Sequence, residues 1–272
     1  MIGVVVYRLR AENSARLPIF HGRLVHGAIF SLLRDWSEEL SYFIHDKLNS
    51  KPFTVSTLTE KNKREKREKD FFVEAKREYY LRLTALNSLV LEALLNPKPH
   101  KQIMVGEAVF SLEEVIANGR LQTGIASEEE LILGAEAMPN VSSIHFSFKS
   151  PVSFRNYDRD YPFPLPEFIF GSLADKWLQA GMPELFDRAA VKAVAQSLQL
   201  GRWRGSSRKV YFAHDRGMMA FTGDFSYSLD RLEPQWQKIF VALAQFAPFS
   251  GVGRLTAQGF GQTQIDFKEL HQ

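Results

Sequence analysis

The sequence of 272 residues contains no cysteine. Without thiol groups the chain can form no disulfide bond, no thiolate zinc site and no cysteine nucleophile, and this composition fits a reducing compartment. Long apolar runs are also missing, because none approaches the roughly 20 residues that a membrane-spanning helix needs. The first residues become charged too early for a secretory signal. We therefore expect a cytoplasmic protein that has no contact with a membrane.

A large net charge is absent as well. The formal charge is +3 and the isoelectric point is about 9.0. This balance permits a nucleic-acid partner without requiring one, because a local basic patch matters more than the sum. Hydrophobic residues make up 45% of the chain and charged residues 24%. These fractions are typical of a globular protein, and the length suits one large or two ordinary domains.

Strands and helices alternate in two similar rounds along the chain. Each round predicts a strand–helix–strand–strand–helix–strand order. The predicted fold class is α+β, with two tandem ferredoxin-like domains of the RRM-like βαββαβ type. We expect the domains at residues 1–121 and 142–272, joined by an acidic, loop-like linker at 122–141. Within the first domain we expect a strand or hairpin at 102–110 and a short helix at 112–117.

Two Gly-x-Gly pairs stand near the C-terminus, and Arg254 is the first of the five residues between them. The glycines are Gly251, Gly253, Gly259 and Gly261. Glycine adopts positive φ at little cost, so the segment predicts a loop whose N–H groups and arginine suit a phosphate chain. It is neither a Walker loop nor a dinucleotide fingerprint, because Thr256 stands where the fingerprint needs glycine. The alternative interpretation is a tight connection before a terminal strand at 262–267.

A basic segment at residues 201–211 is the second candidate for phosphate binding. It contains an aromatic residue and no acid, and its cations are Arg202, Arg204, Arg208 and Lys209. Cations interleaved with an aromatic ring are typical of nucleic-acid contacts. We expect a hairpin here, and a solvated turn is the alternative.

Histidines supply the candidates for acid–base chemistry. His26 and Phe30 lie four residues apart, on the flank of an apolar helix face predicted at 21–33. His45 ends a second, shorter helix, and Lys51 and Pro52 stop any further helix before a strand. Histidine titrates near neutral pH, so either ring could serve as a general acid or base.

Together these features resemble the Cas6 family of CRISPR RNA-processing endoribonucleases, within the RAMP superfamily. The glycine-rich segment, with its lead-in at 246–250, is similar to the signature loop of that superfamily. Residues 45–56 resemble the family's second landmark, a histidine at a helix end followed by a Lys-Pro-Phe-Thr-x-Ser strand. The order from Ser150 and Pro151 to a helix ending at Trp177 resembles the family's second domain. The resemblance covers nearly the whole chain.

The resemblance implies that His45 is catalytic and that Lys51 assists it. The family often carries a tyrosine on the first helix, where this chain has Phe30, which lacks a hydroxyl group. His26 is the alternative catalytic histidine, and His21 is a weaker one. RNA supplies its own nucleophile, the 2′-hydroxyl, so we expect cleavage without a metal or other cofactor. The products would be a 2′,3′-cyclic phosphate and a 5′-hydroxyl.

The implied partner is CRISPR repeat RNA, both as precursor and as mature crRNA, in the cytoplasm of a prokaryote. The expected RNA-binding residues are Arg202, Arg204, Arg208, Lys209, Gly251, Gly253, Arg254, Gly259 and Gly261. A first alternative is a non-catalytic RAMP subunit that holds crRNA in an interference complex. A second is a two-domain protein with no RNA role. The sequence leaves open whether other subunits of such a complex bind and whether the chain forms a homodimer.

Overall fold

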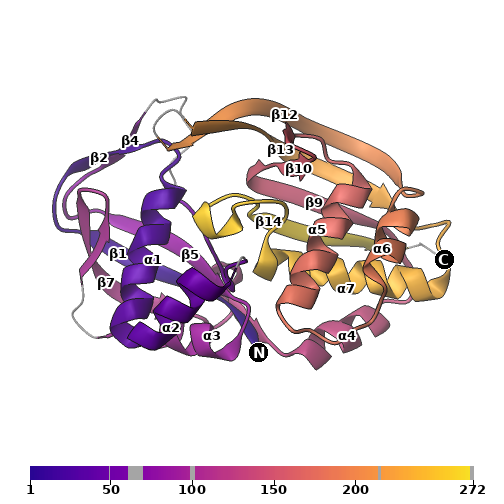
Figure 1. Cartoon of the computed structure of the whole chain (residues 1–272), viewed down its shortest axis with the longest axis horizontal. Helices are drawn as coiled ribbons and strands as arrows, with labels where there is room; N and C mark the ends of the chain where they lie inside the picture. Colours follow the sequence, from indigo (N-terminus) through magenta and orange to yellow (C-terminus); the bar gives the residue numbers. More distant parts are fainter. Residues whose placement is uncertain (49, 61–69, 99–101, 214–215, 270–272) are drawn as a thin grey trace. The chain divides into compact units, whose positions relative to one another are not determined.

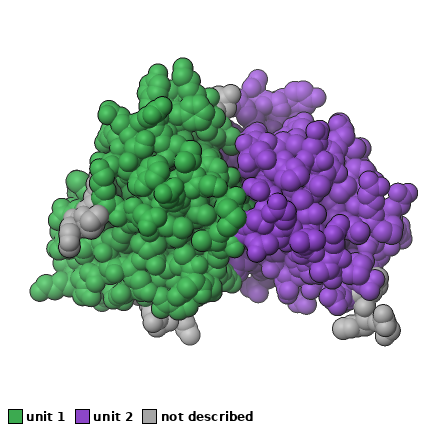
Figure 2. Space-filling model, turned by 90° about the horizontal axis from the view of Figure 1, so that it is seen from below, with its two compact units in different colours: residues 1–125, 211–216, 257–259 green, residues 126–210, 217–256, 260–272 purple. Residues whose placement is uncertain are grey.

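The computed structural model of the protein describes residues 1–48, 50–60, 70–98, 102–213 and 216–269. The chain forms two compact units, which are coloured separately in Figure 2. Unit 1 contains residues 1–125, 211–216 and 257–259, and unit 2 contains residues 126–210, 217–256 and 260–272. Among the described residues, no helix is both long and apolar enough to cross a membrane.

Unit 1 is built around a β-sheet (Figure 1). Its strands are β1 (Ile2–Ala11), β2 (Ala15–Pro18), β3 (Phe53–Val55), β4 (Asp70–Val73), β5 (Glu78–Ala85), β6 (Gln102–Val105), β7 (Ala108–Ile116) and β8 (Gly124–Ala126). Its helices are α1 (Gly22–Trp36), α2 (Glu38–Tyr42), the π-helix η1 (Phe43–Lys47), α3 (Ser88–Leu95) and the short 3-10 helix η2 (Arg120–Gln122).

The strand order of unit 1 is β3-β5-β1-β7-β6. The apolar run at the start of the chain becomes β1, which pairs antiparallel with β5 and β7 and is buried along most of its length. Helix α1 turns one face inward through Val25, Ile29 and Leu33, the helical spacing that the sequence predicts. Counting β3, β5 and β7 as the second, third and fourth strands gives the order 2-3-1-4 of a ferredoxin-like sheet.

Unit 2 repeats this plan. Its strands are β9 (Val141–Val152), β10 (Phe154–Asn156), β11 (Arg159–Tyr161), β12 (Gln199–Ala213), β13 (Arg216–Ser228) and β14 (Thr263–Glu269). Its helices are α4 (Glu128–Glu136), α5 (Pro166–Gln179), α6 (Arg188–Ala195) and α7 (Pro234–Ser250). The short 3-10 helix η3 (Thr256–Gln258) follows α7 in the chain and lies mostly in unit 1. The sheet order β12-β13-β9-β14 is again 2-3-1-4, so the predicted pair of ferredoxin-like domains is confirmed.

An aromatic core joins the helices of unit 2 to its sheet. Phe146 of β9 packs edge-to-face on Phe170 of α5, with ring centroids 5.7 Å apart. Phe170 in turn packs on Phe240 of α7 at 4.5 Å. Such pairs stabilise a fold beyond the apolar area that they bury. These ring contacts therefore fix α5 and α7 against the sheet of unit 2.

Two local predictions were wrong. Residues 112–117 do not form a helix, because β7 continues through Ile116 and pairs with β1. Residues 122–141 are not a loop, because they contain β8 and α4. Ser127 and Glu130 form a reciprocal capping box at the start of α4. This Ser-x-x-Glu signal was present in the sequence, but the acidic composition of the segment was taken to indicate a loop.

Candidate functional site

His26 lies on α1, with its Nδ1 2.7 Å from the carbonyl oxygen of Ala257. A carbonyl oxygen can only accept, so Nδ1 carries the proton and Nε2 of the neutral ring is left with a lone pair. Burial lowers the pKa of His26, and the nearby cations Lys51, His45 and Arg23 lower it further. The ring is therefore neutral at neutral pH and is suited to accept a proton.

Phe30 brings the two candidate histidines into one cluster. Its ring centroid lies 4.8 Å from that of His26 and 5.3 Å from that of His45, and both contacts are edge-to-face. Phe53, which is buried, stacks on His26 at 5.7 Å and contacts Phe30 at 5.5 Å. Phe30 thus acts as a packing surface for both imidazoles.

His45 projects from η1 with its side chain 66% exposed. Its Nδ1 lies 2.7 Å from Oδ1 of Asp46. A carboxylate that accepts from Nδ1 holds the imidazole in a fixed orientation. The sequence analysis did not single out Asp46, although its position directly after the histidine could have indicated it. His45 and Asp46 therefore form an exposed hydrogen-bonded pair, and His45 and His26 pack on the same ring of Phe30.

Lys51 is committed to the backbone at the end of η1. Its Nζ lies 2.9 Å from the oxygen of Ile44, 2.8 Å from that of His45 and 2.6 Å from that of Leu48. An ammonium group has three N–H donors, and these carbonyls use all three. The geometry therefore favours Lys51 as the group that fixes His45 in place, with its charge still close to the cluster.

His21 has a different role from His26. It is buried, its Nδ1 lies 3.1 Å from the oxygen of Pro18, and its Nε2 accepts from the N–H of Leu58 at 2.8 Å. Burial lowers the pKa of His21 to about 4. Both ring nitrogens are used to tie α1 to the segment after β3, so this histidine serves the fold.

The glycine-rich segment adopts the backbone that the sequence predicts. Positive φ angles occur at all four glycines, with values of 63° at Gly251, 79° at Gly253, 92° at Gly259 and 72° at Gly261. A Cβ on Gly261 would lie 2.2 Å from the oxygen of Val252, and one on Gly253 would lie 2.6 Å from that of Ser153. The glycines are therefore required by close backbone packing as well as by φ.

The N–H groups of this segment are used within the protein. Gly251 donates to Ala247 at 2.8 Å, Gly261 to Pro151 at 2.9 Å, and Gly253 to Oγ of Ser172 at 2.9 Å. The ammonium of Lys176 donates to the oxygens of Ser250 and Gly251 and to Oγ1 of Thr256, at 2.9, 3.2 and 3.0 Å. Burial lowers the pKa of Lys176 to about 7. No sequence pattern pointed to this lysine, which helps to hold the segment in shape.

The side chain of Arg254 extends from the glycine-rich segment toward Asp160. The guanidinium Nη1 lies 3.2 Å from Oδ1 of Asp160 on β11, and the side chain is 33% exposed. Because the neighbouring amides are occupied, the guanidinium is the group of this segment best placed to reach an external phosphate.

Residues 201–211 do not form a hairpin by themselves, because all of them lie within the single strand β12 (Figure 1). We call β12 and its neighbour β13, the two longest strands of unit 2, the basic hairpin. Strand β12 lies at the end of the described sheet order. The four cations are exposed, namely Arg202, Arg204, Arg208 and Lys209. An edge strand that carries cations on both faces offers a basic surface.

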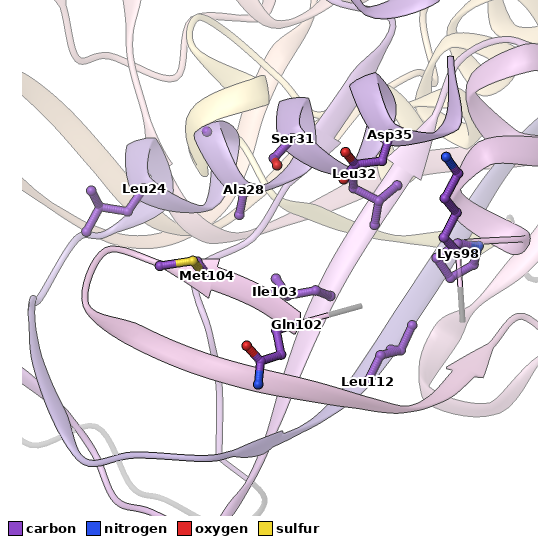
Figure 3. Close-up of a pocket in the computed structure, with 12 residues that line it drawn as sticks. Leu24, Ala28, Ser31, Leu32, Asp35, Lys98, Gln102, Ile103, Met104 and Leu112 are labelled. Atoms are coloured by element: carbon purple, nitrogen blue, oxygen red, sulfur yellow. The ribbon is translucent and has the colours of Figure 1, made fainter. Parts of the chain in front are cut away.

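A pocket of about 240 Å³ also occurs in unit 1 (Figure 3). Helix α1 forms one wall through Leu24, Ala28 and Leu32, and β6 forms the other through Ile103 and Met104. None of the candidate histidines lines it. The lining is mainly apolar and shares no residue with the His26–His45 cluster.

Comparisons with known proteins identify one similar sequence family and several similar structures. The sequence model of the family described as CRISPR-associated endoribonuclease Cas6 matches residues 146–263. A structure described as a Cas6 product complex matches with a TM-score of 0.79 and 29% identity, covering 98% of this chain and 100% of the other. Thermus thermophilus Cas6 matches with a TM-score of 0.71 and 27% identity, covering 98% of each chain. A comparison with curated proteins found no match.

A second Cas6 product complex, 21% identical, has the same fold, with a TM-score of 0.73 and coverage of 97% of this chain and 99% of that one. The paired ferredoxin-like units are the fold that this chain shares with these Cas6 structures. The family model covers less than half of this chain, whereas the Cas6 structures match it over nearly its whole length, so the chain is similar to Cas6 proteins.

Proposed function

We propose that this chain cuts CRISPR precursor transcripts within their repeats by a metal-independent transesterification. In this reaction the 2′-hydroxyl attacks the adjacent phosphorus, the bond to the 5′-oxygen breaks, and the products are a 2′,3′-cyclic phosphate and a 5′-hydroxyl. The observation that carries the proposal is the packing of His26 and His45 against one ring, that of Phe30. Two imidazoles in one cluster can supply both a base and an acid.

The two histidines differ in ways that assign their roles. His26 is half-buried and neutral, and its Nε2 is left to take the proton from the 2′-hydroxyl. His45 is exposed and its imidazole is oriented by Asp46, so it is placed to donate a proton to the departing 5′-oxygen. Lys51 positions His45 through the carbonyls at the end of η1. Both histidines are therefore essential in this proposal, with complementary tasks.

RNA binding is assigned to basic groups of unit 2. We propose that Arg202, Arg204, Arg208, Lys209 and Arg254 contact the RNA backbone, with the repeat RNA held both before and after cleavage. Gly251, Gly253, Gly259 and Gly261 contribute by shaping the segment that presents Arg254, since the N–H groups of Gly251, Gly253 and Gly261 are bonded within the protein. Backbone contacts of this kind position an RNA without reading its sequence.

One assay tests the reaction. Repeat RNA is incubated with the protein in EDTA beside the same RNA carrying a 2′-deoxyribose at the cut site. Cleavage of the ribose substrate alone, with a cyclic phosphate identified by mass spectrometry, is expected. Cleavage that requires added Mg²⁺, or cleavage of the deoxy substrate, contradicts the mechanism. Tight binding of both RNAs without cleavage would instead favour the non-catalytic subunit that holds crRNA.

A further inference from the structure

Trp203 is an exposed aromatic ring in the middle of the basic hairpin. It lies on β12, between Arg202 and Arg204, and 60% of it is exposed to solvent. A Trp side chain buries much apolar area when it meets a partner. By contrast, Trp177 is fully buried in the core of unit 2. The exposure of Trp203 therefore leaves its indole ring available to a ligand.

One face of the indole is already supported from within the sheet. Trp203 stacks on Phe225 of β13, with centroids 6.1 Å apart and ring planes within 5° of parallel. Phe225 is buried and also contacts Phe148 and Phe221. The indole is thus backed by the aromatic core of unit 2 and held in a fixed plane.

The other face of the indole is open. Strand β13 is the neighbour of β12 on one side, and β12 ends the described sheet order on the other. Because Phe225 belongs to β13, the second face of a ring stacked on it is turned away from that strand, beyond the sheet edge.

The neighbours of Trp203 on its own strand leave this ring uncrowded. Side chains two residues apart share a face of a strand, and here those neighbours are Gly201 and Gly205. A Cβ on Gly201 would meet no atom closer than 3.6 Å. At Gly205 a Cβ would lie 2.6 Å from Cζ of Phe225, so glycine there makes room for the supporting ring. The pattern Gly-Arg-Trp-Arg-Gly therefore presents one bare ring between two small residues.

The cations set the chemistry of the ligand. Arg202 and Arg204 are exposed and precede and follow the indole directly, and alternation places them on the opposite face of the strand from it. A nucleotide offers a flat ring and a phosphate on either side of it, which matches a bare indole flanked by two guanidinium groups. A paired base cannot stack on a side chain in this way, because its faces are covered within the helix.

We propose that Trp203 is a stacking platform for one unpaired nucleobase of the bound RNA, with Arg202 and Arg204 contacting the phosphates beside that nucleotide. The proposal rests on the proposed function only in taking RNA as the ligand. It adds that the protein recognises a splayed or single-stranded nucleotide next to any stem. Sequence preference at that position is weak, because every base has a face that can stack.

The test is a thermodynamic cycle between protein and RNA. A synthetic CRISPR repeat RNA is prepared with a single abasic site, moved one position at a time. For the unchanged protein, one or two abasic positions should weaken binding about 5- to 150-fold, the range for one stacked base. Trp203→Ala should weaken binding of intact RNA by a similar factor and should lose no further affinity at those positions. Trp203→Phe should keep part of the effect, since it retains a ring.

Tryptophan emission gives a second, direct measurement. RNA binding should quench the protein's emission, and Trp203→Phe should abolish most of that quenching, whereas Trp236→Phe, the control, should retain it. Circular dichroism melting of each variant checks that the hairpin is folded. If no abasic position couples to Trp203, or if quenching survives Trp203→Phe, the platform is overturned. Coupling without any cleavage would overturn the proposed enzyme activity and leave the platform in place, so the two failures are distinguishable.

Discussion

The Nδ1 atom of His26 lies 2.7 Å from the carbonyl oxygen of Ala257, a residue 231 positions away in the chain. This bond fixes the tautomer of the histidine and links the first helix to the glycine-rich segment. A glycine at position 22 permits the approach, because a Cβ there would lie 2.0 Å from the oxygen of Gln258. The glycine-rich segment therefore contacts α1 at the histidine proposed as the base.

His26→Gln should reduce single-turnover cleavage about 10²- to 10⁴-fold, the range for loss of a general base, and should change RNA affinity little. His145→Ala is the matched control, because this histidine lies in unit 2, bonded to Oγ of Ser226 at 3.0 Å. It should cleave at the unchanged rate. Because the pKa of His26 is lowered, the rate of the unchanged protein should decline with acid only below pH 6.5. Full activity of His26→Gln would exclude the base role.

Buried His21 predicts an acid-sensitive fold. Its pKa is about 4 in the folded state against the ordinary histidine value of 6.5, so only the unfolded state binds this proton between those values. The free energy of unfolding should therefore fall by about 3 kcal/mol as the pH drops from 6.5 to 4, at about 1.4 kcal/mol per unit. Urea titrations across this range measure the loss. His21→Gln should flatten the dependence, and an unchanged slope would contradict the assignment.

Lys51→Met should slow cleavage by up to about 100-fold and leave RNA affinity nearly unchanged, because it removes the bonds that fix the backbone around His45. Hydrogen exchange at residues 43–48 should accelerate in the same variant. Lys51→Arg, which keeps the charge and several donors, should recover part of the rate. If affinity rather than rate is lost, Lys51 contacts phosphate directly.

Two glycine substitutions should change stability in opposite directions. Gly261→Ala places a Cβ 2.2 Å from the oxygen of Val252 at a φ of 72°, so it should lower the free energy of unfolding by more than about 2 kcal/mol. Gly27→Ala lies within α1 and meets nothing within 4 Å. It should raise the free energy of unfolding by up to about 1 kcal/mol. Equal effects in chemical denaturation would show that close packing does not require Gly261.

Arg254→Ala should weaken RNA binding and reduce the slope of log K against log salt by about 0.7, the value for one contact with a single strand. Asp160→Asn should tighten binding, because it frees the guanidinium from its carboxylate. Arg188, which is paired with Asp175, serves as the control. Arg188→Ala should leave the salt slope unchanged, and an equal change in both variants would indicate a general charge effect.

Much of the fold could be read from the chain. The apolar run at the start of the chain indicated β1, and alternating apolar residues indicated β9. Helical spacing indicated α1, and the two Gly-x-Gly pairs indicated the loop before β14. Residues 112–117 misled because a short apolar and acidic run fits a helix or a strand, and only pairing with β1 decides between them. Residues 122–141 misled because composition was weighed above the capping signal of Ser127 and Glu130.

The sequence by itself determined the α+β class, the two ferredoxin-like units, the positive φ of the four glycines and the candidate residues, because these depend on local spacing and on residue type. Tertiary structure alone decided where those residues' bonds go. In the folded protein Lys51 donates to backbone carbonyls, and the N–H groups of Gly251, Gly253 and Gly261 donate to other protein groups. Asp46 is hydrogen-bonded to His45, and both histidines pack against Phe30. Other decisive contacts, such as His26 to Ala257 and Gly261 to Pro151, join residues far apart in the chain, so no local sequence pattern predicts them.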